Sequence, residues 1–293
     1  MRKKTCILAL AGLLALVMAA SGCVAPEASG AEKTEIKESQ TNFSELTPTE
    51  PRQNTVPPAH DSVPAPDVPD EPVQPSYDFS QPVPESEPVD NSYFEDAAFV
   101  GDSRTDGFMI YSGIGCGENL TSNGLSIFKL AEKKAITIDG NKYTLIEALG
   151  LKQYGKVYLS LGVNELGYNN DQGFYDAYCN AIDLIRQSQP NAVIYIQGLI
   201  PLNEQVISET GGSKYLKNDH LLIYNDLMKK AAEEKQVVFL DLNPEFAGED
   251  GQLPREASKD GIHLRKAYCQ KWLEYLKTHT VSYDTLYGEK PEA

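Results

Sequence analysis

The 293-residue chain predicts an α/β domain built on a parallel sheet with helices on both faces. In its second half, short apolar stretches with strand character alternate with longer amphipathic stretches. In addition, three polar clusters follow the ends of strands or lie in the last loop. The alternating segments are a strand over 156–161, a helix over 174–187 that Pro190 ends, a strand over 192–200, a helix over 220–235, a strand over 237–242 and a helix over 265–277.

The first part of the domain is less regular. It predicts a strand over 97–100, a short helix over 105–112 and a short strand over 120–122. Residues 135–145 favour a hairpin around an Asp-Gly turn, added to the side of the main sheet. The segment 201–219 shows no periodicity and follows the C-terminal end of a strand. It is therefore predicted either as a lid at the rim of an active site or as a surface insertion.

The sequence Gly101-Asp102-Ser103 ends the first strand abruptly. Glycine permits a sharp exit with unusual dihedral angles, and a serine at the start of a helix lies beside backbone N–H groups that can stabilise an oxyanion. Ser103 is therefore the candidate nucleophile, at the carboxyl end of a strand, where open α/β sheets hold their chemistry. A turn with a helix N-cap is the alternative interpretation.

A serine nucleophile needs a base, and the chain contains four histidines: His60, His220, His263 and His279. Only His263 has an acid within its own loop, in the sequence Asp260-Gly261-Ile262-His263. The Asp-Gly turn and the three-residue spacing allow the carboxylate of Asp260 to fold back onto the imidazole. The two residues are candidate catalytic partners of Ser103, and a polar turn before the last helix is the alternative.

A third cluster, Gly162-Val163-Asn164-Glu165, follows the strand over 156–161. The side-chain amide of Asn164 could point to the same place as the backbone N–H of Ser103, as electrostatic stabilisation of acyl transfer requires. An ordinary turn also explains an Asn after Gly. The three clusters together, in the order Ser, Gly-x-Asn and Asp-x-x-His, favour the catalytic interpretation.

In this order the clusters resemble the sequence blocks of the SGNH hydrolases, also called GDSL esterases and lipases, over about residues 93–280. The remaining block of that family is a glycine in the loop after the second strand, and Gly124 matches it best. The resemblance implies a three-layer α/β/α sandwich with a flavodoxin-like sheet. It also implies a catalytic triad of Ser103, His263 and Asp260. The oxyanion hole would be formed by the backbone N–H groups of Ser103 and Gly124 and the side chain of Asn164.

The sequence departs from the family pattern at two positions. Arg104 replaces the usual Leu and is expected to alter the substrate-facing surface more than the chemistry. Glu165 replaces Asp, so that the role of this position in holding the third block does not carry over directly.

The first 22 residues have the features of a secretory signal. Three basic residues, 2–4, precede an apolar run over 6–20 that is short for a membrane-spanning helix. The run ends in Ala20-Ser21-Gly22-Cys23, which resembles the lipobox of bacterial lipoproteins. Lipidation of Cys23 would anchor the protein stably outside the cytoplasm, with the anchor as its only contact with the membrane. An ordinary signal peptide is the alternative.

Residues 23–90 differ in composition from the domain at 91–293. They contain 13 of the 18 prolines, and 14 acidic residues against 3 basic ones. A segment with so few apolar and so many charged residues cannot bury enough surface to offset its chain entropy. It is therefore predicted to be a disordered, largely extended tether.

The charge and motifs of the domain limit its partners. Residues 91–293 carry a net charge of −8 without a basic cluster, which argues against nucleic acid and direct adhesion to anionic lipid and favours a neutral substrate. No metal-ligand spacing, phosphate-binding loop or dinucleotide fingerprint is present, so that neither a metal nor a cofactor is expected. The three cysteines of the domain, Cys116, Cys179 and Cys269, are expected to be buried, unpaired thiols.

These features favour a lipid-anchored, monomeric serine esterase that needs no cofactor. Ser103 would attack an ester carbonyl, His263 would transfer the proton and Asp260 would orient the imidazole. A polar tether that reaches outward favours a short acyl group, such as acetyl, on a carbohydrate. A lysophospholipid or lipid esterase, an O-acyltransferase with the same residues, and a glycan-binding lipoprotein without catalysis are the alternatives.

Overall fold

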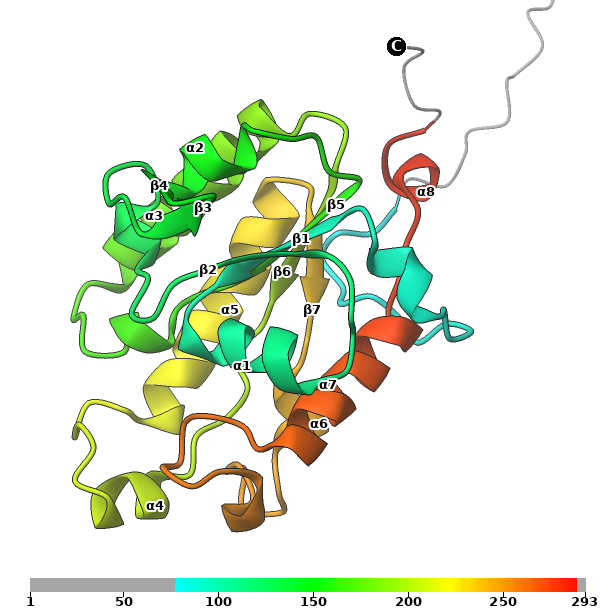
Figure 1. The fold of residues 1–293 in the computed structure, drawn as a ribbon. Helices are drawn as coiled ribbons and strands as arrows, with labels where there is room; N and C mark the ends of the chain where they lie inside the picture. Colours follow the sequence, from blue (N-terminus) through cyan, green and yellow to red (C-terminus); the bar gives the residue numbers. More distant parts are fainter. Residues whose placement is uncertain (1–76, 289–293) are drawn as a thin grey trace, which may run out of the picture. The chain divides into compact units, whose positions relative to one another are not determined.

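The computed structural model describes residues 77–288, which form a five-stranded parallel sheet flanked by helices (Figure 1). The strand order is β2-β1-β5-β6-β7 and every neighbouring pair is parallel. All five strands therefore end at the same edge of the sheet. Their bounds are β1 (Ala97–Gly101), β2 (Glu118–Thr121), β5 (Lys156–Ser160), β6 (Val193–Gln197) and β7 (Val238–Leu240).

The helices pack in two layers, with α2, α3 and α5 against one face of the sheet and α1 and α7 against the other. The three-layer α/β/α architecture predicted from the sequence is confirmed. The helices are α1 (Ser103–Tyr111), α2 (Leu145–Leu149), α3 (Asp171–Ser188), α4 (Glu204–Glu209), α5 (Asn218–Glu234), α6 (Asn243–Phe246), α7 (Lys266–Thr278) and α8 (Tyr283–Tyr287). Short 3₁₀ turns are η1 (Asn91–Phe94), η2 (Ile127–Lys129), η3 (Val163–Glu165) and η4 (Arg255–Ala257).

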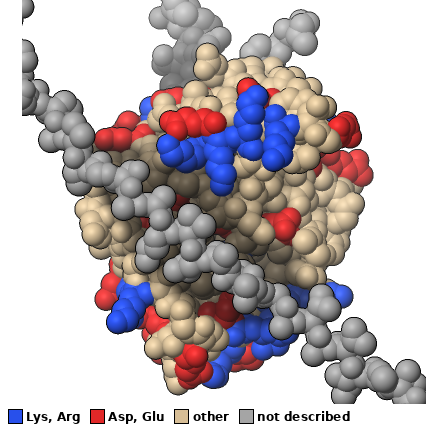
Figure 2. All heavy atoms as spheres, turned by 60° about the vertical axis from the view of Figure 1, so that its left-hand side comes forward, with Lys and Arg blue, Asp and Glu red and all other residues tan. Residues whose placement is uncertain are grey.

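Charged side chains are spread unevenly over the domain. Figure 2 shows one face on which Lys and Arg gather in a compact group near the top and alternate with acidic side chains near the bottom. The segment 129–142, which leads into the hairpin at the upper left of Figure 1, carries four lysines, two of them paired with glutamates. The net negative charge of the domain therefore conceals local groups of cations.

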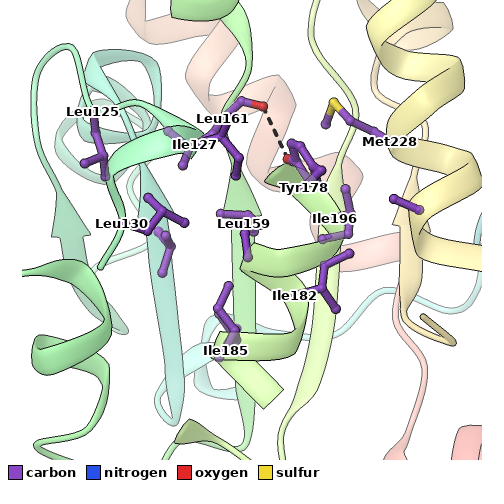
Figure 3. Packing of buried hydrophobic residues seen from close by; sticks show 14 of the residues in the cluster. Leu125, Ile127, Leu130, Leu159, Leu161, Tyr178, Ile182, Ile185, Ile196 and Met228 are labelled. Carbon is purple, nitrogen blue, oxygen red and sulfur yellow. Dashed lines mark hydrogen bonds between the residues drawn. The ribbon is translucent and has the colours of Figure 1, made fainter. Parts of the chain in front are cut away.

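Strands β1, β5, β6 and β7 send alternate side chains into two separate cores, as the two-residue period of a strand requires. In β1, Ala98 and Val100 belong to the core under α2, α3 and α5, whereas Ala97 and Phe99 belong to the core under α1 and α7. Figure 3 shows the first core, where Leu159 and Ile196 from adjacent strands face residues of α3 and α5. Burial on both faces explains why these strands are almost continuously apolar in sequence.

Aromatic rings fill the second core. Phe99, Tyr158 and Tyr195, from three adjacent strands, stack with ring centroids 4.9 Å and 4.5 Å apart. Trp272 of α7 is buried in the same core, and its indole N–H donates to Gln197 Oε1 over 2.9 Å. The closing helix is thereby fixed against β6, which holds the loop before it over the C-terminal edge of the sheet.

Residues 77–90 pack on the domain, although their composition places them in the predicted tether. Val83 is buried in the second core and its backbone N–H donates to the carbonyl of Phe239 in β7, and Val89 N–H donates to the carbonyl of Lys277. Tyr77 and Phe79 pack against the same core. A few apolar anchors among prolines are thus enough to order the segment, and the folded domain reaches at least from Tyr77.

The irregular parts of the chain contain more structure than expected. The predicted hairpin exists as a separate two-stranded sheet of β3 (Ile136–Ile138) and β4 (Asn141–Tyr143). The stretch 201–219, predicted as aperiodic, contains α4, whose N-cap Asn203 accepts from Val206 N–H. Asn203 also donates its backbone N–H to the carbonyl of Gly261, so that this segment supports the loop with the candidate histidine.

Cys179 and Cys269 are buried free thiols, and the partly buried Cys116 is also free. Within residues 77–288, no helix has the length and apolar character needed to cross a membrane. The predicted signal peptide, the lipidation site Cys23 and tether residues 23–76 lie outside the described residues.

Candidate active site

Ser103 is the first residue of α1, directly after β1. Asp102 caps this helix, because its Oδ1 accepts from the backbone N–H of Arg104 over 2.9 Å. Gly101 is required for close packing: a Cβ there would lie 2.0 Å from Thr105 Oγ1 and 2.8 Å from the carbonyl oxygen of Ser160. Gly101 is not among the residues with positive φ, so that close approach and not an unusual dihedral angle explains this glycine.

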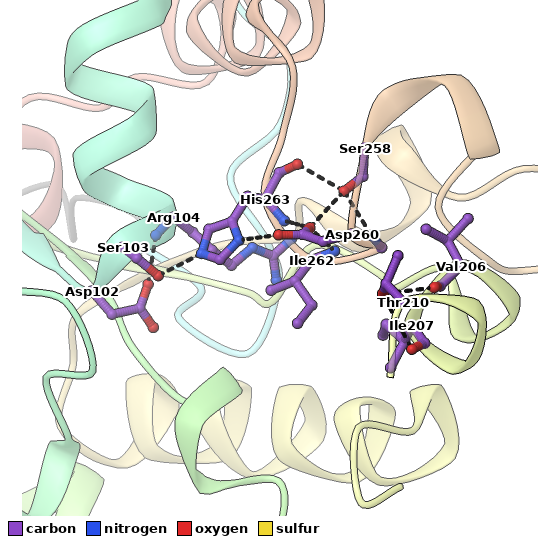
Figure 4. Close-up of polar contacts among 11 residues, drawn as sticks. Asp102, Ser103, Arg104, Val206, Ile207, Thr210, Ser258, Asp260, Ile262 and His263 are labelled. Carbon is purple, nitrogen blue, oxygen red and sulfur yellow. Dashed lines mark hydrogen bonds and ion pairs between the residues drawn. The ribbon is translucent and has the colours of Figure 1, made fainter. Parts of the chain in front are cut away.

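The structure brings the three candidate catalytic residues into one hydrogen-bonded chain (Figure 4). Ser103 Oγ lies 2.8 Å from His263 Nε2, and His263 Nδ1 lies 2.7 Å from Asp260 Oδ2. Because Nδ1 faces a carboxylate, it carries the ring proton, and the Nε2 lone pair faces the serine hydroxyl. His263 is therefore oriented to accept the proton of Ser103.

The loop between η4 and α7 fixes the acid of this chain. Asp260 Oδ1 accepts from the backbone N–H groups of Ile262 and His263, each over 2.9 Å. Burial would raise the pKa of Asp260, but the hydrogen bonds from His263 and from these N–H groups hold it well below its usual range. A Cβ at Gly261 (φ +82°) would lie 2.5 Å from the carbonyl oxygen of Asn203, so that only glycine fits this turn.

Asn164 follows β5 in η3 and lies close to the nucleophile's helix cap. Its Nδ2 donates to Asp102 Oδ2 and to the carbonyl of Leu125, both over 3.1 Å. Asp102 is 2 % exposed, and this burial raises the pKa of its carboxyl group. The amide of Asn164 therefore connects the Ser103 turn with the loop after β2.

Gly124 lies in that loop, three residues after the end of β2, with φ +66°. The loop is held from η3, since Glu165 Oε1 accepts from the backbone N–H of Ile127 over 3.0 Å. No described contact joins Gly124 to Ser103, so that its role in an oxyanion hole stays a prediction. Glu165, which replaces the family's Asp, positions this glycine-bearing loop.

Burial raises the pKa of Glu165 to about 7, and the hydrogen bonds from Ser126 and Ile127 only partly oppose this effect. Glu165 is 4 % exposed, and its Oε2 has no hydrogen-bond partner within residues 77–288. The buried Asp102 also raises the pKa of Glu165. The two buried carboxyl groups are therefore coupled electrostatically.

The prediction that Arg104 alters the substrate-facing surface is wrong, because its side chain is buried. The residue is 6 % exposed, and its Nη1 donates to the carbonyl of Ile200 over 3.0 Å. Burial lowers the pKa of its guanidinium to about 10, while Asp102 and Asp260 oppose the shift. Arg104 lies on the buried side of α1, so that its guanidinium is inside the protein.

The structure contains a second histidine–aspartate pair that no sequence motif indicates. His220 of α5 has Nε2 3.0 Å from Asp171 Oδ1 and Nδ1 2.9 Å from the carbonyl oxygen of Leu166. The two partners are 49 and 54 positions away in the chain, so that no local spacing could have revealed them. Both ring nitrogens face oxygen acceptors, and none faces a hydroxyl nucleophile.

Within residues 77–288, no group of three or more His, Cys, Asp and Glu side chains is arranged to hold a metal ion. The site consists of a serine, an oriented imidazole and an ionised carboxylate, beside amide donors. This set can carry out nucleophilic acyl transfer with the protein's own side chains.

Comparisons with known proteins give one family match and several structures with a similar fold. Residues 99–268 match the model of the GDSL-like lipase/acylhydrolase family. A structure from Streptococcus pneumonia, described as a platelet activating factor, is 22% identical to this chain with a TM-score of 0.51, and the match covers 64% of this chain and 83% of that one. A GDSL-like lipase from Bacteroides thetaiotaomicron shares 12% identity over 64% of this chain and 88% of its own, with a TM-score of 0.44.

A peptidoglycan O-acetylesterase structure shares 18% identity over 55% of this chain and 45% of its own, with a TM-score of 0.43. Among curated proteins, none matches this chain. The likeness to the Streptococcus structure supports the fold, and the family match covers every element of the candidate triad.

Proposed function

The chain belongs to the GDSL-like lipase/acylhydrolase family and is an ester-bond hydrolase, and we propose that it is an extracytoplasmic serine esterase that removes short acyl groups from carbohydrate. The hydrogen-bonded chain from Ser103 through His263 to Asp260, with distances of 2.8 Å and 2.7 Å, is the observation that carries the proposal.

The reaction follows from the orientation of His263. Ser103 Oγ attacks the ester carbonyl carbon while its proton passes to Nε2. Collapse of the tetrahedral intermediate breaks the bond to the alcohol, which takes the proton from Nε2 and leaves an acyl-serine. Water then attacks the acyl-serine, with His263 again as base, and releases the acid and the free serine. Asp260 stays ionised throughout and stabilises the imidazolium.

The negative charge of each tetrahedral intermediate needs donors beside Ser103. The backbone N–H of Ser103, at the start of α1, is one candidate, and the N–H of Gly124 and the amide of Asn164 are the others. Asn164 donates to Asp102 and to Leu125 in this structure. An oxyanion would therefore take over one of its N–H groups during the reaction.

The location and substrate class come from the sequence of the N-terminal part. A basic and apolar start followed by Ala20-Ser21-Gly22-Cys23 supports secretion and lipidation of Cys23. A Pro-rich, acidic segment between this cysteine and the domain supports a tether that directs the enzyme toward extracellular glycans. Cell fractionation of Cys23→Ser tests the anchor, since the variant should be released or left unprocessed.

A fluorophosphonate probe tests the nucleophile directly, because it forms a covalent bond only with an activated serine. We expect the probe to label the intact protein at Ser103 and to leave Ser103→Ala unlabelled. Ser213→Ala, a change at an exposed serine outside the site, is the matched control. Equal labelling of Ser103→Ala, or a wild-type protein that is neither labelled nor active on any ester, would contradict the proposal.

Graded p-nitrophenyl esters and acetylated oligosaccharides then test the acyl and alcohol specificity. We expect kcat/KM to be highest for acetyl and to fall with acyl length. Preference for long acyl chains would replace carbohydrate with lipid as the substrate class, and acyl transfer to an added sugar in excess of hydrolysis would identify a transferase.

A further inference from the structure

A cavity of about 420 Å³ opens beside the catalytic histidine, and its charge suggests what part of the substrate it holds. It lies on the side of the triad formed by the end of α1 and the loop that leads into α7. The residues that line it are Tyr111, Lys259, Asp260, His263, Leu264, Arg265 and Lys266. A substrate bound for attack by Ser103 can therefore extend into this cavity.

The cavity carries three cations that the protein itself does not neutralise. Lys259, Arg265 and Lys266 are exposed, and among the described residues their side chains form no ion pair. The only carboxylate that lines the cavity, Asp260, is already bonded to His263. Lys259 and Arg265 also line a neighbouring cavity of about 520 Å³ that contains Glu256.

The charged residues next to the cavity already have partners, in contrast to its three cations. Arg255 pairs with Glu209, and Glu256 Oε1 accepts from the hydroxyl of Tyr268 over 3.3 Å. Three unpaired cations next to a reactive site are unexpected in a domain whose acidic residues outnumber its basic ones. Local charge, more than net charge, governs what a site attracts.

We propose that this cavity is a subsite for a negatively charged group, a carboxylate or a phosphate, carried by the glycan whose ester is cleaved at Ser103. The inference rests on the proposed esterase function and specifies acidic carbohydrate as its substrate class, in place of the neutral substrate that the net charge of the domain favours. A guanidinium and two ammonium groups bind oxyanions through charge-assisted hydrogen bonds. Tyr111, which is 50 % exposed, presents ring surface on which a sugar can pack.

Three esters that differ in one group test the subsite. They are the monoacetylated methyl glycosides of glucose, of glucuronic acid and of glucose 6-phosphate, which are neutral, carboxylated and phosphorylated. We expect the wild-type enzyme to show a roughly 10- to 100-fold higher kcat/KM for at least one anionic ester than for the neutral one, mainly through KM, as hydrogen bonds between charged groups imply. The preferred anion identifies the group, and added salt should reduce the preference.

Lys259→Gln, Arg265→Gln and Lys266→Gln, singly and combined, should abolish the preference and leave turnover of the neutral ester unchanged. The control is Lys133→Gln combined with Lys142→Gln. Both lysines are exposed and, among the described residues, form no ion pair, and they lie at the hairpin of β3 and β4, far from α7 in Figure 1. Thermal midpoints establish that each variant is folded, and the single variants retain the test if the triple variant is not.

Two failures can be told apart. If no ester is cleaved by the wild-type enzyme, the proposed function itself is wrong. If the neutral ester is cleaved as fast as both anionic ones, or if the control variant loses the preference as strongly as the subsite variants, the subsite is overturned while the esterase function stands.

Discussion

Two histidines of this domain lie against aspartates, and only one of them faces a nucleophile. His263 has Asp260 on Nδ1 and the hydroxyl of Ser103 on Nε2. His220 has the carbonyl of Leu166 on Nδ1 and Asp171 on Nε2. A carboxylate beside an imidazole therefore does not make a general base, because the second ring nitrogen must also be free to accept a proton.

The pair at His220 has a structural consequence for the catalytic site. His220 bonds to the carbonyl of Leu166, the residue directly after Asn164 and Glu165. The ring of His220 also contacts Tyr224, and the hydroxyl of Tyr224 donates to the carbonyl of Glu165. His220 thus fixes the segment that holds the Ser103 turn and the Gly124 loop. One pair performs the chemistry and the other supports the residues that assist it.

The largest expected effect separates the two histidines. His263→Ala should lower kcat/KM for p-nitrophenyl acetate by roughly 10³- to 10⁶-fold, because serine and base act as one unit. His220→Ala should retain activity within about tenfold and lower the thermal midpoint by roughly 3–10 °C, since two hydrogen bonds are lost. Loss of activity in His220→Ala by 10³-fold at an unchanged midpoint would reverse the two roles.

Substitution of Asp260 should lower activity far more than substitution of Asp171. Asp260→Asn keeps the size of the side chain but removes the charge that selects the tautomer of His263, so that activity should fall on the order of 10³- to 10⁴-fold. Asp171→Asn should have almost no effect on activity, because no hydroxyl depends on His220. Measurement of kcat for both variants decides, and near-equal effects would contradict a distinction between the pairs.

The contrast also shows what the sequence could predict. The sequence predicts the triad because Asp260 and His263 are three residues apart and Ser103 follows a recognisable strand. It predicts the parallel strands for a related reason, since burial on both faces makes the middle of β5 and most of β6 apolar. Local signals of this kind survive in a single sequence.

Features that depend on distant partners could not be predicted. The acceptors of His220 are far away in the chain, and the inward direction of Arg104 is set by the packing of α1. α2 has a capping box of Thr144 and Glu147, but its first turn overlaps the predicted hairpin and conceals the signal. Composition places residues 77–90 in the tether, because it does not show that Val83 packs in a core formed by distant strands and helices.

Asn164 tests whether the segment fixed by His220 takes part in the reaction. If its amide stabilises the oxyanion, Asn164→Ala should lower kcat about 10²-fold and leave KM nearly unchanged, as loss of one donor does. A change in KM alone would make Asn164 a substrate contact. If the thermal midpoint falls by as much as in His220→Ala and kcat does not change, the amide serves only to join Asp102 to Leu125.

The smallest expected effect concerns the stability of the same segment as a function of pH. Burial raises the pKa of Glu165 to about 7 from an ordinary value of 4.5, so the folded state binds this proton more tightly than the unfolded state does. Between these two pH values the wild-type free energy of unfolding should therefore fall as pH rises. Glu165→Gln keeps an acceptor for the N–H of Ile127 and cannot ionise. Its stability relative to wild type should rise by up to about 3 kcal/mol across this window.

Urea unfolding of both proteins at several pH values between 4 and 8 measures this difference. Glu204→Gln is a control of opposite sign: burial would raise the pKa of Glu204, but hydrogen bonds from Lys217 and Asn218 lower it. Its carboxylate therefore stabilises the fold above its unfolded pKa and loses this contribution as pH falls. If Glu165→Gln and wild type instead show parallel stability curves, Glu165 is ionised in the folded protein. The η3 segment would then hold the Gly124 loop with a carboxylate that is already charged at pH 5.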